Sequence, residues 1–200
     1  MSHTLYTTEC IVLGSRDSGE ANKYISLFTK EMGLVRAVAK SVREERSKLR
    51  YSLQNFSFTD ATLVRGKEVW RITGAEERYS LHNDFKEDRN KLFVVTQILS
   101  LLQRLVHGEE RNDYLFSTLS DGLEYLRSNE MNKETLKNFE HLIVLRILYS
   151  LGYIAKKDDK ENFAELLQET LVSKELLKKT QMSRKQIIFA INRALKETHL

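Results

Sequence analysis

The sequence contains no proline among its 200 residues and a single cysteine, Cys10. One cysteine cannot form an internal disulfide or supply a cysteine-rich zinc site. Without proline, the turns depend on Gly, Asn, Asp and Ser. No stretch approaches the ~18 consecutive apolar residues of a membrane span, and the first residues lack the cationic start and apolar centre of a signal peptide. We therefore expect a cytoplasmic protein without membrane association.

Motifs of common catalytic sites are also missing. There is no Gly-x-x-x-x-Gly-Lys-Ser/Thr loop for nucleotide phosphates and no Gly-x-Gly-x-x-Gly turn. The histidines show no pair at metal-ligand spacing; they are His3, His82, His107, His141 and His199. Asp17 and Glu20 would suit a metal-dependent nuclease, but a carboxylate pair in a turn is usually solvated, so this stays a weak alternative. We expect no enzyme activity, metal or cofactor.

The first 75 residues alternate apolar and polar side chains, as strands do. This pattern predicts strands at 6–15, 23–29, 34–42, 55–65 and 68–75. Five short strands joined by hairpin-length turns fit a small closed barrel, and the oligonucleotide/oligosaccharide-binding (OB) barrel has that size and strand count. An SH3-like barrel is the competing topology.

From Phe85 the apolar residues recur at helical spacing. Leucine-rich stripes predict helices around 92–106, 115–126 and 136–149, with shorter pieces at 163–168 and 174–179 and a last helix beginning at Ser183. Lys156 to Lys160 reads as a charged loop. We therefore expect a multidomain α+β protein, with an OB-fold-like barrel over residues 1–79 and an all-helical bundle over residues 80–200.

A stripe of basic residues runs along the third predicted strand and into the loop after it. Strand period places Val35, Ala37 and Ala39 on one small apolar face, and Arg36 and Lys40 on the other. The following loop adds more cations, so that residues 34–50 hold six Lys/Arg against two Glu and carry a net charge of +4, equal to that of the whole chain. The stripe consists of Arg36, Lys40, Arg43, Arg46, Lys48 and Arg50. Cations so arranged would track the phosphates of a nucleic acid; the alternative is an ordinary solvated strand and loop.

Non-specific single-strand binding also requires aromatic side chains on which bases can stack. The candidates in the barrel are Tyr24, Tyr51, Phe56, Phe58 and Trp70. Most of these are expected in the core, and Tyr51 is favoured because it directly follows the charged loop.

The order of short motifs along the first half resembles the RecO recombination-mediator family. The matching pieces are Ile11–Arg16, Ser18–Glu20, Leu27–Thr29, Gly33–Lys40, Ser47–Arg50, Leu53–Phe56 and Leu63–Gly66, followed in the helical half by Leu151-Gly-Tyr-Ile154. Many family members hold zinc through four cysteines after that turn, whereas this chain has Lys156 to Lys160, so the resemblance is to the zinc-free kind. The family commonly has glycine where Ser41 stands.

The resemblance implies a DNA repair and recombination function without catalysis. RecO-like proteins bind single- and double-stranded DNA, anneal complementary strands and assist recombinase loading onto DNA coated by single-strand-binding protein. They work with a RecR-type partner. The alternative is a protein-interaction adaptor whose barrel does not bind DNA.

The resemblance also implies that the acidic tail of single-strand-binding protein docks on the helical domain. Such a dock requires cations beside an apolar groove. The third predicted helix offers both kinds of side chain: Lys137, His141, Leu142, Arg146 and Tyr149. Ordinary surface residues beside a core stripe are the alternative interpretation.

Overall fold

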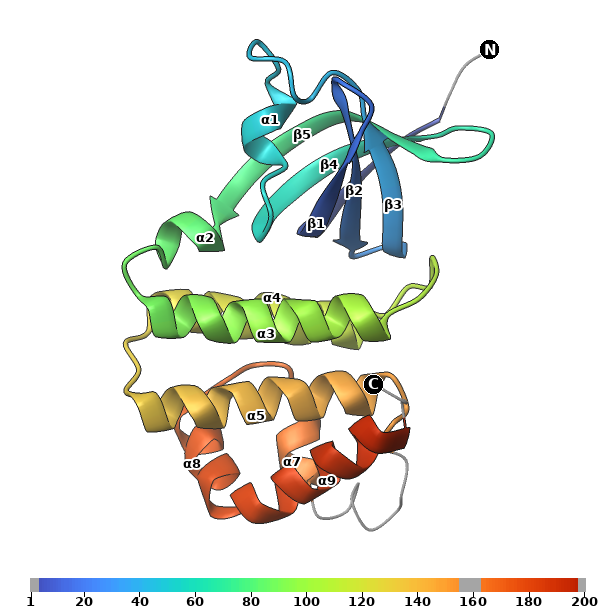
Figure 1. Cartoon of the computed structure of the whole chain (residues 1–200). Coiled ribbons are helices and arrows are strands. Elements are labelled where there is room, and N and C mark those ends of the chain that lie inside the picture. Colours follow the sequence, from blue (N-terminus) through green and yellow to red (C-terminus); the bar gives the residue numbers. More distant parts are fainter. Residues whose placement is uncertain (1–3, 155–162, 198–200) are drawn as a thin grey trace. The chain divides into compact units, whose positions relative to one another are not determined.

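The computed structural model describes residues 4–154 and 163–197, and the charged loop expected at 156–160 lies outside this part. The chain divides into two compact units (Figure 1). The first comprises residues 1–92 and 106–112, and the second comprises residues 93–105 and 113–200. The boundary expected at residue 80 coincides with the end of the last strand, although the first unit continues beyond it.

The first unit is a closed five-stranded barrel. Its elements are β1 (Leu5–Ser18), β2 (Asn22–Thr29), β3 (Gly33–Ala39), α1 (Leu49–Ser52), β4 (Ser57–Arg65) and β5 (Trp70–Ser80). The strand order is β1-β2-β3-β5-β4. The β3–β5 pair is parallel and the other pairs are antiparallel. Strand β1 closes the ring because residues 5–11 pair with β4 while residues 10–18 pair with β2. The predicted OB-fold-like barrel is confirmed, and the four-residue helix α1 was not predicted.

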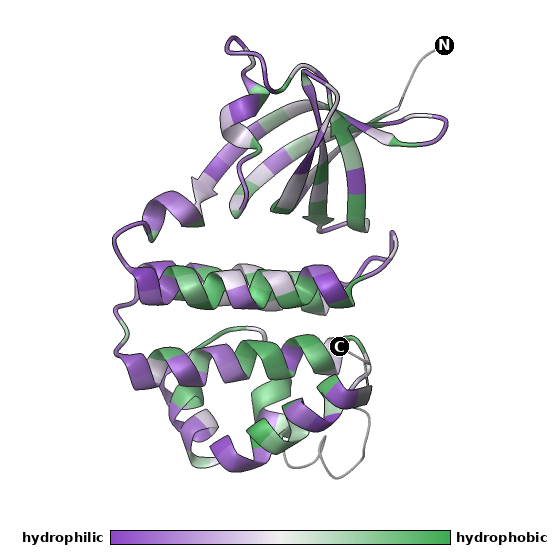
Figure 2. Ribbon diagram, viewed as in Figure 1, coloured by the Kyte–Doolittle hydropathy of each residue, from purple (hydrophilic) through white to green (hydrophobic). Residues whose placement is uncertain are grey.

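Small side chains of β3 line the barrel interior. Val35, Ala37 and Ala39 are fully buried and pack with Trp70 and Ile72 of β5 in one apolar cluster. Figure 2 shows hydrophobic and hydrophilic residues alternating along the barrel strands, as the strand period requires. The predicted inward face of the third strand is confirmed.

Strand β3 ends at Ala39, whereas the sequence predicted that it would continue to Val42. The reason lies in the backbone: Ser41 has a φ of 52°, in the left-handed region, and the chain turns there. The Ser41 amide donates to Asn22 Oδ1 at 2.9 Å, which holds this turn beside the start of β2. Lys40 therefore begins the loop instead of extending the strand.

Helices dominate the rest of the chain. They are α2 (Leu81–Asp84), α3 (Arg89–Leu105), α4 (Asp113–Ser128), α5 (Lys133–Ser150), α7 (Ala164–Leu167), α8 (Lys174–Met182) and α9 (Arg184–Glu197). Within the second unit, α5 contacts α4, α7, α8 and α9. A side chain at Gly122 of α4 would meet Ile143 of α5 at 2.7 Å, so glycine permits this close approach. None of the helices in residues 4–154 and 163–197 is long and apolar enough to cross a membrane.

Helix α5 ends in a glycine cap. Gly152 has a φ of +83°, and the amide of Tyr153 donates back to the Leu148 carbonyl at 2.9 Å. This is the hydrogen bond of a Schellman cap. It folds the chain back and buries Ile154 against the unit.

Candidate nucleic-acid interface

The predicted basic stripe is exposed on the barrel. Arg36 projects outward from β3, and Lys40 follows the last residue of the strand. Neither forms an ion pair with any residue that the structure describes. Arg36, on the side of β3 opposite to its buried alanines, and Lys40, just beyond the end of the strand, are thus two exposed cations without an ion-pair partner in the described part of the chain.

Strand register adds two arginines that the sequence analysis did not include. Arg16 of β1 pairs with Tyr24 of β2, which pairs with Val38 of β3, and Val38 pairs with Arg71 of β5. Directly paired residues point to the same side of a sheet, so Arg16 and Arg71 share the outer side with Arg36 and Lys40. We call this surface the basic face, and its cations are Arg16, Arg36, Lys40 and Arg71.

Neither arginine could be assigned to this face without the topology. Arg16 was expected in a turn, but β1 continues to Ser18. Arg71 was expected on a strand, yet its neighbours depend on the parallel β3–β5 pair that closes the barrel. Arg16 and Arg71, like the two cations of the stripe, form no ion pair within residues 4–154 and 163–197.

The loop after β3 and the short helix α1 carry the remaining predicted cations, all of them exposed. Arg43 lies 3.5 Å from an Asp17 carboxylate oxygen and donates to the Gly19 carbonyl at 3.0 Å. Arg46 lies 3.2 Å from Glu44. Such exposed pairs contribute little free energy, so a phosphate can replace the carboxylate. Lys48 and Arg50 form no ion pair in the part of the chain that the structure describes.

Two of the candidate aromatic side chains are well exposed: Tyr51 of α1 at 70% and Tyr24 of β2 at 44%. Phe58 and Trp70 are buried. The Trp70 indole donates to Glu109 at 2.8 Å and contacts the Tyr6 ring edge-on. Phe58 and Trp70 therefore belong to the core, Phe56 is partly buried, and Tyr24 and Tyr51 are the exposed candidates.

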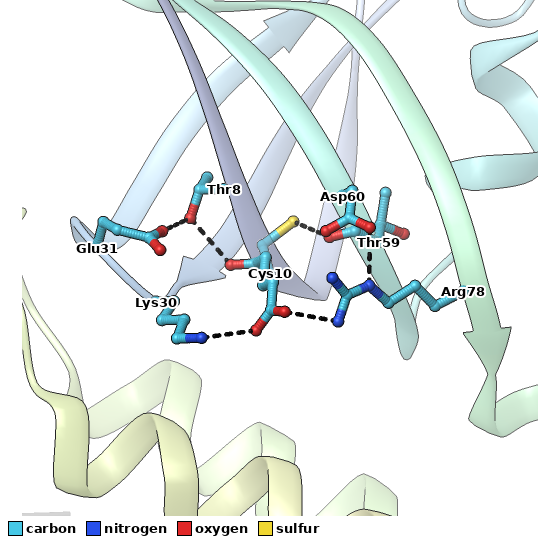
Figure 3. A network of polar contacts seen from close by, with 8 residues as sticks. Thr8, Cys10, Lys30, Glu31, Thr59, Asp60 and Arg78 are labelled. Atoms are coloured by element: carbon cyan, nitrogen blue, oxygen red, sulfur yellow. Dashed lines mark hydrogen bonds and ion pairs between the residues drawn. The ribbon is translucent and has the colours of Figure 1, made fainter.

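On β1, β4 and β5 the barrel carries a network of paired charges, drawn in Figure 3. Arg78 lies 2.7 Å from both Glu9 and Asp60, and Lys30 lies 3.2 Å from Glu9. Burial alone would raise the pKa of Glu9, but the hydrogen bonds from Arg78 and Lys30 outweigh it and hold the pKa below its ordinary value. The hydrogen bond to Asp60 raises the pKa of Arg78. These charged side chains pair with one another within the barrel.

The single cysteine lies beneath this network. Burial raises the pKa of Cys10 to about 12, and its thiol donates to the Thr59 carbonyl at 3.2 Å. A thiol that stays protonated is a poor nucleophile. Cys10 is therefore a core residue of β1.

The dock expected on α5 is wrong in two of its five residues. Lys137 is exposed, and His141 and Tyr149 are partly exposed, but Leu142 and Arg146 are fully buried. The Arg146 guanidinium donates to the carbonyls of Leu166, Thr170 and Leu171, at 2.8, 2.6 and 3.3 Å. Burial lowers the pKa of Arg146. Arg146 therefore holds α7 and the segment that follows it, and offers no cation to a partner.

A hollow of about 260 Å³ lies elsewhere in the helical unit. Lys174 and Lys178 of α8 border it, together with Leu177, Tyr125 and Asn138, and none of the five predicted docking residues lines it. Its lining combines two cations and apolar surface, which a dock for an acidic segment requires, with one carboxylate, Glu130.

The structure groups no metal ligands among the residues it describes: no three His, Cys, Asp or Glu side chains there lie close enough to hold an ion. Asp17, one of the two carboxylates considered for a nuclease, lies near Lys23 at 3.9 Å and Arg43 at 3.5 Å.

The first unit is thus an OB-type barrel with a cationic outer face, and helices follow it in the chain. Residues 1–80 match the family described as "Recombination protein O N terminal". The chain is 31% identical over 137 residues to the DNA repair protein RecO of Alkaliphilus metalliredigens, an alignment covering 68% of this chain and 55% of the relative. It is 30% identical over 169 residues to the DNA repair protein RecO of Dehalococcoides mccartyi strain CBDB1, covering 83% and 64%.

The chain therefore belongs to the RecO family, as the sequence motifs predicted. The aligned regions span between about half and two thirds of the length of these curated relatives.

Proposed function

We propose that this protein is a DNA repair and recombination mediator that binds single- and double-stranded DNA, anneals complementary strands and assists recombinase loading onto DNA coated by single-strand-binding protein. The observation that carries the proposal is the basic face, whose four cations form no ion pair within the described residues. The printed names of the relatives, DNA repair protein RecO, support the same function.

The proposed binding is electrostatic. Lysine and arginine side chains that neutralise phosphates release counterions and hold DNA without reading its sequence. The outer side of strands β2 and β3 is also the surface with which OB barrels bind oligonucleotides. A strand held by its phosphates keeps its base edges free to pair with a complementary strand, which is what annealing requires. No step needs a catalytic residue.

The proposed partners are the acidic tail of single-strand-binding protein and a RecR-type protein. For the tail, the exposed Lys137 and the partly exposed His141 and Tyr149 remain candidates, whereas Arg146 and Leu142 are buried. The hollow bordered by Lys174 and Lys178 is the second candidate position. Both lie in the helical unit, so tail binding and DNA binding should be separable by mutation.

The test of DNA binding is the anisotropy of labelled single- and double-stranded DNA at two salt concentrations. Replacing Arg36, Lys40, Arg43 and Lys48 together by alanine should weaken binding to unrelated sequences and flatten the log–log salt slope by about 0.7 for each lost single-strand contact. A matched control removes four exposed cations of the helical unit instead, with the same change in net charge; these are Lys137, Lys174, Lys178 and Lys185.

Each outcome decides between the candidate functions. Equal affinity of the wild type and a folded barrel variant would reject the basic face as the DNA site. A wild type that binds no DNA would favour the adaptor function, and magnesium-dependent cleavage would favour a nuclease.

Tail docking is tested by titrating a labelled acidic peptide with an apolar C-terminus. Lys137→Glu should abolish binding if the outer side of α5 is the dock, and Lys174→Glu with Lys178→Glu should abolish it if the hollow is the dock. Peptide affinity unchanged in both variants would place the dock on another surface.

A further inference from the structure

We propose that Tyr24 is a base-stacking platform inside the basic face, and that the barrel consequently prefers single-stranded to double-stranded DNA. The inference rests on the proposed DNA-binding function and goes beyond it by naming the aromatic contact and the favoured form of DNA. It is carried by the strand register and by the exposure of the ring.

The register places Tyr24 among the cations. Arg16 is its direct neighbour on β1, and Val38 is its direct neighbour on β3. Arg71 lies one strand beyond Val38, so a strand spacing of about 4.8 Å separates the Arg16 and Arg71 backbones by roughly 14 Å. Arg36 and Lys40 each lie two residues from Val38, about 7 Å along the chain. Phosphates bound at these cations would pass on either side of the Tyr24 ring.

The ring itself is available. A tyrosine opposite a valine is an ordinary cross-strand pair, and in that role alone neighbouring side chains would cover it. Here the residue is 44% exposed, and its neighbours on the same side of β2 are the small polar residues Asn22 and Ser26. Within the described residues no cation lies over the Tyr24 ring, whereas the Arg65 guanidinium lies 5.3 Å from the centroid of the Trp70 ring.

The preference for single strands follows from what a ring can reach. In a duplex the bases stack on one another, whereas an unpaired base can turn out and stack on an aromatic side chain. The four cations attract the phosphates of either form. Tyr24 therefore adds affinity for unpaired DNA alone, while the cations supply the part common to both forms.

The experiment compares Tyr24→Thr and Tyr24→Phe with the wild type, using an oligothymidine and a hairpin duplex of equal nucleotide number. Threonine keeps a strand-forming residue without the ring. We expect Tyr24→Thr to lose about tenfold in single-strand affinity, with the duplex affinity and the salt slope unchanged. Tyr24→Phe should bind like the wild type, because the stacking surface remains.

The matched control is Tyr6→Thr. Tyr6 is 41% exposed, close to the value of Tyr24, but its ring packs edge-on against Trp70 with the centroids 5.4 Å apart. This variant removes the same group without touching the basic face, and we expect it to keep the wild-type ratio of single-strand to duplex affinity. An equal loss on both DNA forms in Tyr24→Thr would show a structural role and overturn the inference, and no loss on either would do the same.

If Tyr24→Thr fails to fold, a second measurement still tests the inference. Tyr24→Trp introduces an exposed indole at position 24, in addition to the buried Trp70. Stacking on a base should quench the emission of the new indole with oligothymidine but not with the duplex. Equal quenching by both forms, or none by either, would overturn the inference. Failure of the proposed function and failure of the Tyr24 inference give different results. A wild type that binds no DNA rejects the proposed function. Salt-dependent binding by the wild type that does not change in the Tyr24 variants rejects only the stacking role of Tyr24.

Discussion

Arg36 of β3 and Arg146 of α5 occupy opposite situations. Arg36 projects from the barrel and has no ion-pair partner among the described residues, whereas Arg146 is fully buried and donates to three backbone carbonyls. The difference lies in what surrounds each guanidinium. The end of α7 and the segment after it have carbonyls that need donors, and a buried arginine satisfies them. Arg36 is exposed on the outer side of β3, and no carboxylate in the described part of the chain pairs with it, so the cation remains available to a ligand.

The largest effect is expected from Arg146→Met. The change keeps an apolar stem of similar length but leaves up to three carbonyls without donors, which should cost about 3 kcal/mol of unfolding free energy. Urea denaturation followed by circular dichroism measures the loss. Lys137→Met on the exposed side of the same helix is the control and should change stability by less than about 0.5 kcal/mol. Equal stability of the two variants would contradict the role assigned to Arg146.

The reverse pattern is expected on the barrel. Replacing Arg36 and Lys40 by alanine should leave the unfolding free energy within about 0.5 kcal/mol of the wild type, because neither side chain has a described partner to lose. Affinity for single-stranded DNA should fall on the order of tenfold at about 0.1 M salt, with a slope flatter by about 1.4 for two contacts. A variant that loses stability but keeps its affinity for DNA would contradict this prediction, because Arg36 and Lys40 would then stabilise the fold as Arg146 does.

These two arginines also show how far the sequence carries. Strand period two separated Arg36 from Val35 and Ala37 unambiguously, and the structure confirms that separation. Helix α5 offers no such separation, because its buried residues surround it on almost every side. When a helix is apolar all round, the helical period cannot say which side a polar residue faces. The orientation of Arg146 was therefore not predictable from spacing.

The basic face was predictable only in part, for a different reason. Arg36 and Lys40 are close in sequence, and Arg16 joins them through the hairpin pairs β1–β2 and β2–β3, on a part of β1 that lies beyond the first predicted strand. Arg71 joins them only through the parallel β3–β5 pair, which no local pattern encodes. The same dependence explains why Tyr51 was favoured from its position after the charged loop, whereas the surroundings of Tyr24 required the topology.

A smaller effect is expected where barrel charges are paired. The pKa of Glu9 lies below its ordinary value in the folded barrel, because the hydrogen bonds from Arg78 and Lys30 outweigh burial. Around pH 4 the folded state thus binds fewer protons than the unfolded state. The stabilisation is complete above the unfolded glutamate pKa of about 4.3 and is lost as the pH falls through the lower folded value.

Replacing Glu9 by glutamine should therefore cost at most about 1 kcal/mol at neutral pH, given the partial exposure of the pair, and should reduce the loss of stability below pH 5. Thermal unfolding of both proteins across the acidic range measures this. The Arg36→Ala variant is the control, because a cation without a described partner should leave the acid profile as it is. An acid profile of Glu9→Gln that matches the wild type would separate Glu9 from the stability of the barrel.

The last effect, of similar size, concerns the turn that joins β3 to the cationic loop. Ser41 has a left-handed φ of 52°, which costs a residue with a Cβ atom about 1 kcal/mol and glycine almost nothing. Its hydroxyl also donates to the Glu44 carboxylate, which lowers the pKa of Glu44. Ser41→Ala removes the hydroxyl and keeps the strain, whereas Ser41→Gly removes both. We expect the glycine variant to be more stable than the alanine variant by about 1 kcal/mol, measured by urea denaturation. If Ser41→Ala proved as stable as Ser41→Gly, residue 41 would not adopt the left-handed conformation in solution. The turn at residue 41, and with it the position of Lys40 at the start of the loop, would then have to be reassigned.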